Sequence, residues 1–167
     1  MGNKKLILSL FVTFCISLVC RASSSGENIG NRARSYIGSR TWLYSSSHVT
    51  GVNTNKCNIF VADVLKEENC PAPNRSWWRY SPIGAGEWAN PNSEYLNSSR
   101  CWEICDSPVK GDVIAMGGHV GIVSGSRNTT SASALAQPRG LIVENDWGFR
   151  SDDNATCWRY RHNISNC

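Results

Sequence analysis

The sequence has little of three features that identify large classes of protein. Charged residues make up only 18% of the 167 residues and form no basic stripe, which argues against a nucleic-acid-binding surface. Cysteines with Cys-x-x-Cys spacing are absent, which argues against a structural zinc site. No internal repeat is present. The 41% of apolar residues is nevertheless enough to bury one core, so we expect a single globular domain.

The first 22 residues have the layout of a signal peptide. Lys4 and Lys5 precede an uncharged run over residues 6–19, and small residues flank a cleavage position after Ala22. This run is too short for a transmembrane helix, and no later run has spanning length. We therefore expect a secreted, extracellular protein without stable membrane insertion. Residues 23–167 hold 14 basic and 13 acidic side chains, so we expect no nucleic-acid partner.

Secretion changes the interpretation of the cysteines. Six of the eight follow the predicted leader, and an oxidising compartment favours disulfides among them. They are Cys57, Cys70, Cys101, Cys105, Cys157 and Cys167. Five Asn-x-Ser/Thr sequons suit a eukaryotic secreted glycoprotein. They begin at Asn74, Asn97, Asn128, Asn154 and Asn163.

The order of the predicted elements is α+β, with helices first and an antiparallel sheet second. Helices are expected over residues 28–37 and from Thr54 or Asn55 to Asn69, with apolar residues at helical spacing. Residues 71–109 contain four of the seven tryptophans and form an ordered insertion with a helical turn near residues 86–89. The predicted strands cover residues 112–116, 119–124, 141–145 and 157–160, and Gly117-Gly118 joins the first two as a hairpin.

Cys57 falls in the first turn of the second helix, where backbone N–H groups and the helix dipole favour a thiolate. The same N–H groups can hold an oxyanion. Lys56 is expected to point to solvent and to lower the thiol pKa slightly. A buried helical cysteine is also commonly a core or disulfide residue.

His119 opens a strand after the glycine pair and can act as the proton acceptor and donor for Cys57. On the next strand Glu144 and Asp146 share one face and Asn145 takes the other, and either face can orient the imidazole. The residues alone support a Cys–His hydrolase and a disulfide-stabilised binding module equally.

Four motifs together resemble one superfamily of hydrolases. They are Ala33 to Gly38, Lys56-Cys57-Asn58-Ile59-Phe60-Val61, Lys110-Gly111-Asp112-Val113-Ile114-Ala115 and Gly118-His119-Val120-Gly121-Ile122-Val123. This succession resembles the NlpC/P60 and CHAP cysteine amidases of cell walls, which are papain-like. Gly86 to Ala89 and Asn145 to Arg150 are most similar to family 2 of the type VI secretion amidase effectors. The secreted form resembles the domesticated amidase effectors of ticks and mites.

The resemblance implies a papain-like α+β domain that cleaves peptide stems of bacterial peptidoglycan, at the D-alanine to diaminopimelate cross-link in the bacterial effectors. Cys57 is then the nucleophile and His119 the base, with Glu144 or Asp146 as the third residue. Trp88, Trp102 and Asn58 are expected to contact substrate. We expect a monomeric antibacterial enzyme of innate immunity that needs no metal and no cofactor.

The disulfide count separates this enzyme from its rivals. A catalytic Cys57 leaves five cysteines, hence two disulfides and one leftover in one of fifteen arrangements. We expect the bridges to staple the tryptophan-rich insertion and the C-terminal tail. A non-catalytic cell-wall or glycan-binding protein would instead pair all six cysteines, and a secreted inhibitor or toxin on the same scaffold is a third possibility.

Overall fold

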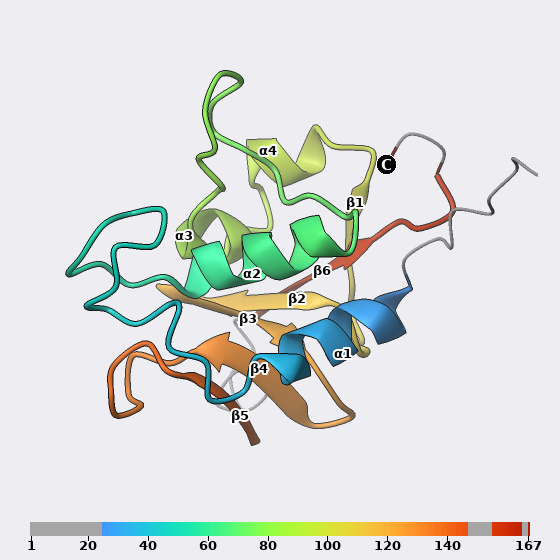
Figure 1. The fold of residues 1–167 in the computed structure, drawn as a ribbon. Coiled ribbons are helices and arrows are strands. Elements are labelled where there is room, and N and C mark those ends of the chain that lie inside the picture. The colour runs from blue at the N-terminus through green and yellow to red at the C-terminus, as the bar shows by residue number, and fades with distance from the viewer. Residues whose placement is uncertain (1–24, 147–154, 165–166) are drawn as a thin grey trace, which may run out of the picture.

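The computed structural model describes residues 25–146, 155–164 and 167. The predicted signal peptide, the motif at residues 147–150 and the sequon at Asn154 lie outside these residues. The described chain is α+β, as expected, with helices packed on one antiparallel sheet of six strands (Figure 1). Among the described helices, none is long and apolar enough to cross a membrane.

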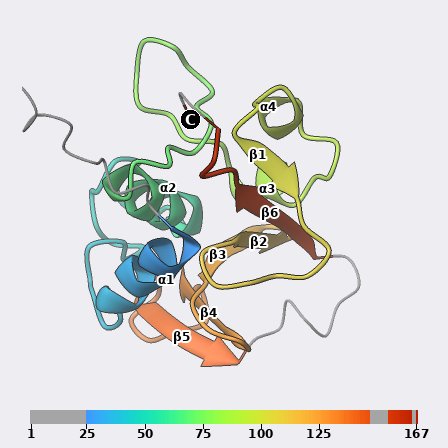
Figure 2. The same ribbon diagram turned by 90° about the vertical axis from the view of Figure 1, so that its right-hand side faces the viewer.

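Two longer helices cover one face of the sheet (Figures 1 and 2). Helix α1 (Gly26–Ser35) buries Ile29 and Ala33, and the Ser25 hydroxyl accepts a hydrogen bond from the Asn28 amide at its start. Helix α2 (Cys57–Glu67) buries the apolar stripe that predicted it. Both predicted helices are therefore confirmed, with ends that differ by about two residues. The short helices α3 (Ala85–Trp88) and α4 (Glu94–Asn97) follow.

The sheet has the strand order β1-β6-β2-β3-β4-β5 and is antiparallel throughout. Its strands are β1 (Trp102–Ile104), β2 (Val113–Met116), β3 (His119–Val123), β4 (Asn128–Ala132), β5 (Ile142–Asp146) and β6 (Thr156–Tyr160). Met116 pairs with His119, so the predicted hairpin at Gly117-Gly118 is confirmed. Strands β1 and β4 were not predicted.

Side chains alternate between the two faces of the central hairpin. Val113, Ala115, Val120 and Ile122 belong to the main core beneath α1 and α2. Ile114 and Val123 pack with Met116 and Ala155 in a smaller cluster on the other face. His119 alternates with Val120 along β3, so its side chain lies on the same face of the sheet as the smaller cluster. His119 is the first residue of β3 and follows the turn that the start of α2 contacts.

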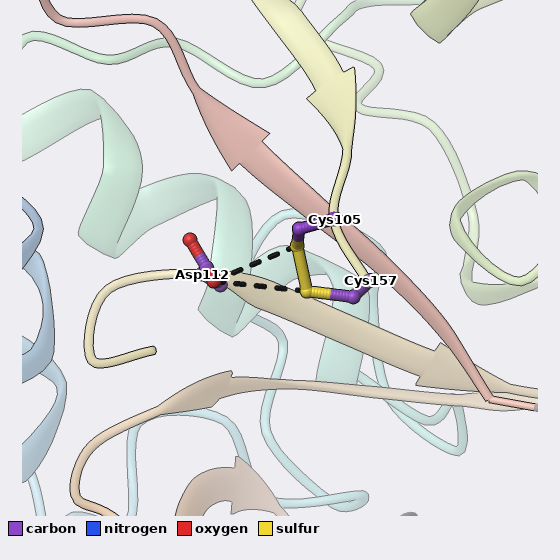
Figure 3. A group of neighbouring side chains, drawn as sticks. All are labelled: Cys105, Asp112 and Cys157. Atoms are coloured by element: carbon purple, nitrogen blue, oxygen red, sulfur yellow. Dashed lines mark hydrogen bonds between the residues drawn. A yellow bond between two sulfur atoms is a disulfide. The ribbon is translucent and has the colours of Figure 1, made fainter. Parts of the chain in front are cut away.

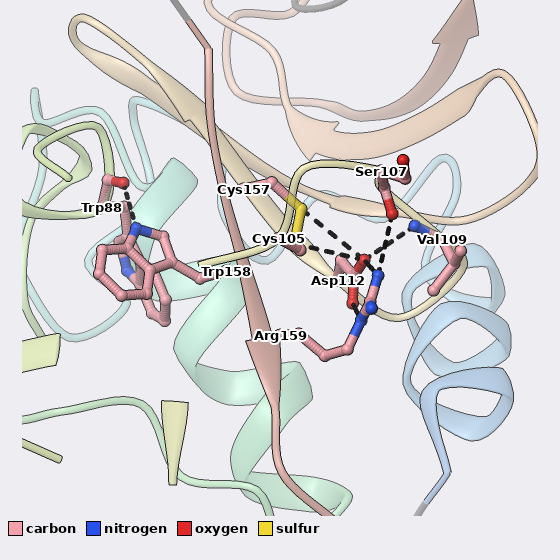
Figure 4. The surroundings of a disulfide bond; sticks show 8 residues. All are labelled: Trp88, Cys105, Ser107, Val109, Asp112, Cys157, Trp158 and Arg159. Atoms are coloured by element: carbon pink, nitrogen blue, oxygen red, sulfur yellow. Dashed lines mark hydrogen bonds and ion pairs between the residues drawn. A yellow bond between two sulfur atoms is a disulfide. The ribbon is translucent and has the colours of Figure 1, made fainter. Parts of the chain in front are cut away.

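The tryptophan-rich insertion contributes to the core. It contains α3, α4 and β1, and the rings of Trp88 and Trp102 meet edge to face with centroids 5.0 Å apart. The Trp158 indole on β6 donates a 2.8 Å hydrogen bond to the Trp88 carbonyl (Figure 4). This packing explains why a segment with little periodicity is ordered.

Two disulfides join the insertion to the C-terminal part of the chain. They are Cys101–Cys167 and Cys105–Cys157, the second shown in Figure 4. Cys57 and Cys70 remain thiols. The predicted count of two disulfides is confirmed. Both crosslink the insertion to the C-terminal tail, as predicted.

Candidate active site

Cys57 is the first residue of α2, and its side chain is only 5% exposed. Its Sγ lies 4.0 Å from the Gly118 carbonyl oxygen in the β2–β3 turn. The helix therefore starts directly beside the turn that carries His119. Both residues line one pocket of about 340 Å³, so the structure brings the predicted nucleophile and base together.

His119 is half-buried at the first position of β3. Its Nε2 lies 3.1 Å from the Ser131 hydroxyl on β4, which also lines the pocket. Gly121 allows β3 and β4 to lie this close together, because a Cβ atom there would lie only 2.6 Å from Thr129 Cγ2 and 3.0 Å from the Thr130 carbonyl oxygen. The Ser131 hydroxyl is thus within hydrogen-bonding distance of the imidazole. Sequence reasoning missed it because β4 is polar and shows no apolar alternation.

The electrostatics of the pair differ from the expectation of a thiolate. Burial raises the pKa of the Cys57 thiol, while the backbone N–H groups of Val120, Asn58 and Cys57 itself oppose this shift. Burial also lowers the pKa of His119. The N–H groups at the helix start favour the thiolate, as expected, but the effect of burial on the thiol pKa is larger. Both shifts favour the uncharged forms, a thiol and a neutral imidazole.

Lys56 does not point to solvent, contrary to expectation. It is 1% exposed, and its ammonium donates to the Leu43 carbonyl at 3.1 Å and to the Thr54 carbonyl and hydroxyl at 3.2 Å each. Burial lowers its pKa. These hydrogen bonds tie Leu43 and Thr54 to the residue that precedes Cys57.

Glu144 does not reach His119. Its Oε1 accepts hydrogen bonds from the Ser124 hydroxyl at 2.8 Å and from Arg34 Nε at 3.0 Å, and it does not line the pocket. The interpretation of Glu144 as the third catalytic residue was therefore wrong. Asp146 ends β5 opposite Asn128, but its side chain lies outside the described part of the structure. Asn145, on the opposite face of β5, does line the pocket.

The three residues expected to contact substrate are used elsewhere. Trp88 and Trp102 are 0% and 4% exposed, so their predicted substrate contact was wrong. Asn58 donates from Nδ2 to the Ile83 carbonyl at 3.2 Å, which fixes the chain before α3 and does not place its side chain in the pocket. The remaining pocket wall consists of Asn55, Met116, Gly118, Ala132, Ser133, Ala134 and Leu135.

One group of side chains has the spacing of a metal site, namely Cys105, Asp112 and Cys157 (Figure 3). The two sulfur atoms are bonded to each other, so neither is a thiolate ligand. The Asp112 carboxylate is occupied by Arg159, which donates from Nε at 2.9 Å and from Nη2 at 2.7 Å (Figure 4). This group is therefore a structural cluster without a free carboxylate for a cation.

The Gly111-Asp112 motif has a structural explanation in the same region. Gly111 has a φ of +95°, and a Cβ atom there would lie 2.2 Å from the Gly26 carbonyl oxygen, so only glycine allows α1 to approach. Asp112 is buried, accepts a 2.8 Å hydrogen bond from the Val109 amide and pairs with Arg159. The motif holds α1 and β6 to the sheet.

The sequence matches no protein-family model and no curated protein.

Proposed function

We propose that this protein is a secreted, papain-like cysteine peptidase of the NlpC/P60 and CHAP type that cleaves peptides of bacterial peptidoglycan. The observation that carries this proposal is the shared pocket of Cys57, at the first turn of α2, and His119, at the first position of β3. The Ser131 hydroxyl beside Nε2 supplies a positioning group. The motifs that resemble the amidase effectors supply the substrate class.

The burial of the pair determines how the chemistry runs. His119 accepts the Cys57 proton as the sulfur attacks the carbonyl carbon, because the resting thiol is neutral. The N–H groups at the start of α2 then stabilise the oxyanion of the tetrahedral intermediate. The imidazolium returns its proton to the leaving amine as the C–N bond breaks, which leaves a thioester. Water, deprotonated by His119, hydrolyses the thioester and restores the thiol.

The pocket wall suits a small, uncharged residue at the scissile carbonyl. Gly118, Ala132 and Ala134 present no more than a methyl group to the pocket, and Asn55 and Asn145 offer amides for the peptide backbone. Among the described lining residues, only His119 and Cys57 carry ionisable side chains. We therefore propose cleavage on the carboxyl side of D-alanine, at its bond to diaminopimelate in the cross-link.

The thiol at Cys57 favours the enzyme over the rival binding module, in which all six cysteines would pair. The test is digestion of purified sacculi by the wild type, Cys57→Ala and His119→Ala, with the released muropeptides identified by mass spectrometry. Each variant should lose more than about 10⁴-fold in rate, and the double variant should be hardly worse than either single one.

Cys70→Ala is the matched control, because Cys70 is also a buried thiol in the described core but does not line the pocket. This variant should digest sacculi at the wild-type rate. Turnover by pure Cys57→Ala protein, or wild-type protein that is folded and releases no muropeptide from any sacculus, would contradict the proposal.

A further inference from the structure

A loop of residues 74–82, called here the tryptophan loop, lies between α2 and α3 and exposes two large aromatic rings. Trp77 is 96% exposed and Trp78 is 66% exposed. The other tryptophans that the structure describes, Trp42, Trp88, Trp102 and Trp158, are at most 4% exposed. The loop projects beyond α3 and α4 in both views of the fold (Figures 1 and 2).

The exposure of these rings does not come from a lack of structure. The Asn74 side chain accepts a 2.6 Å hydrogen bond from the Ser81 amide, and the Arg75 amide donates to the Ser81 carbonyl at 2.8 Å. The Tyr80 hydroxyl donates to Asp63 Oδ1 on α2 at 2.9 Å. The fold therefore holds the loop in one shape while its two indoles stay in water, which is unfavourable unless another surface covers them.

The charge around the exposed rings is positive. The Arg79 guanidinium lies 4.8 Å from the Trp78 ring centre, and the Lys66 ammonium lies 5.1 Å from that of Tyr80. Neither Arg79 nor Lys66 takes part in the ion pairs between described residues. The acids nearby have other partners. Glu87 pairs with Arg75, and the Asp63 carboxylate also accepts from Trp42 and His48.

We propose that the tryptophan loop docks onto a lipid surface that contains anionic headgroups. Indole rings partition into the interface between headgroups and acyl chains, and Arg and Lys beside them attract anionic lipid. The loop is a projecting tip, whereas a small-ligand site is concave and has a few convergent polar groups beside its apolar wall. Membrane docking therefore fits these residues better than binding to a glycan strand.

This inference goes beyond the proposed peptidase activity and does not depend on it. No residue of the tryptophan loop lines the pocket of Cys57 and His119. Its contact with lipid is peripheral. Binding to vesicles can thus succeed or fail independently of sacculus digestion.

The test is co-sedimentation of the purified protein with vesicles of phosphatidylcholine alone or with phosphatidylglycerol added. We expect binding to the anionic vesicles that weakens as salt is raised. Trp77→Ser/Trp78→Ser should weaken it at least about tenfold, because both interfacial rings are lost. Arg79→Gln should weaken it about fivefold.

Two matched controls test whether the effect belongs to this loop. Val52→Ser removes an apolar side chain that is 57% exposed elsewhere, and Arg127→Gln removes an exposed cation in the β3–β4 turn. Both should bind the anionic vesicles as the wild type does. The proposal is overturned if the wild type binds no vesicle, if neutral and anionic vesicles bind equally, or if the tryptophan variant binds normally. It is also overturned if Trp77 and Trp78 are needed for binding to purified peptidoglycan and not to vesicles.

Discussion

At the scale of single residues, burial decides the state of the candidate catalytic pair. It raises the pKa of Cys57 and lowers the pKa of His119, so both shifts favour the neutral forms. An ion pair at rest is therefore disfavoured, and the proposed mechanism requires His119 to act as a general base in each turnover.

The pH dependence of the site follows from these two shifts. A lowered pKa keeps the imidazole of His119 neutral until the pH falls below its ordinary 6.5, so hydrolysis should decline only under more acidic conditions. The rate of Cys57 alkylation by iodoacetamide should continue to rise at pH values where an exposed cysteine levels off. A pH series of both rates, with a cysteine-containing peptide as the reference, measures this. An acid limb above pH 6.5 would contradict the expectation.

Removing the Ser131 hydroxyl should weaken catalysis without removing it. Ser131→Ala deletes the group 3.1 Å from His119 Nε2, and a hydrogen bond of about 1 kcal/mol corresponds to about a fivefold loss in kcat. KM should stay unchanged, because orientation of the base is lost and not substrate contact. Ser133→Ala is the matched control in the same pocket wall, since its hydroxyl accepts from the Leu135 amide instead. Equal effects in the two variants would refute the positioning role.

At the scale of elements, the site depends on how closely β3 lies against β4. Gly121 in β3 faces Thr129 and Ser131 across the strand pair, with no room for a side chain. Its lack of a Cβ lets the strand that begins with His119 approach the strand that carries Ser131. Lys56 fixes the start of α2, because its buried ammonium donates hydrogen bonds to the Leu43 and Thr54 carbonyls.

A methyl group at position 121 should therefore disturb both stability and the site. Gly121→Ala would place Cβ 2.6 Å from Thr129 Cγ2, and the resulting overpacking should cost about 1–3 kcal/mol in the free energy of unfolding. Its kcat should also fall. Gly125→Ala in the following turn is the control, because its nearest neighbour would be Asn128 Cβ at 3.6 Å, an ordinary contact. Urea unfolding measures both variants. A Gly121→Ala protein with wild-type stability would contradict the close-approach argument.

At the scale of the whole molecule, structural bridges and candidate chemistry occupy different ends of the sheet. Both disulfides involve β1, β6 and the segments next to them, at one side of the strand order. The pocket is built from the start of α2 and from β3, β4 and β5. Figure 2 shows β1 and β6 above and β4 and β5 below. The bridges can therefore stabilise the fold without contact with the thiol at Cys57.

Loss of one bridge should reduce stability and spare the site. Cys105→Ala/Cys157→Ala removes a crosslink across 52 residues and should lower the free energy of unfolding by about 2–4 kcal/mol. Sacculus digestion at 25 °C should continue, because neither residue lines the pocket. Non-reducing peptide mapping of the denatured wild type should show alkylation of Cys57 and Cys70. A disulfide that includes Cys57 would contradict both the pairing and the proposed nucleophile.

Local patterns in the sequence predicted α1, α2, the β2–β3 hairpin and the places of Cys57 and His119 in them, but not β1 and β4. The apolar stripe from Cys57 to Leu65 requires a helix, and the glycine pair between two apolar strands requires a hairpin. Those two patterns place Cys57 at a helix start and His119 at a strand start. The count of cysteines likewise predicted two disulfides, because a catalytic thiol at Cys57 leaves five of the six cysteines to pair.

Only the tertiary structure decided which side chains meet. Polar β4 has no apolar alternation, so nothing local predicted that Ser131 would lie beside His119. The alternation of side chains along β5 allowed Glu144 to be near His119, but its carboxylate instead contacts Arg34 and Ser124. The tryptophans show the same limit. Composition cannot distinguish buried Trp88 from exposed Trp77, because the packing of α3 against β6 and the projection of residues 74–82 are long-range outcomes.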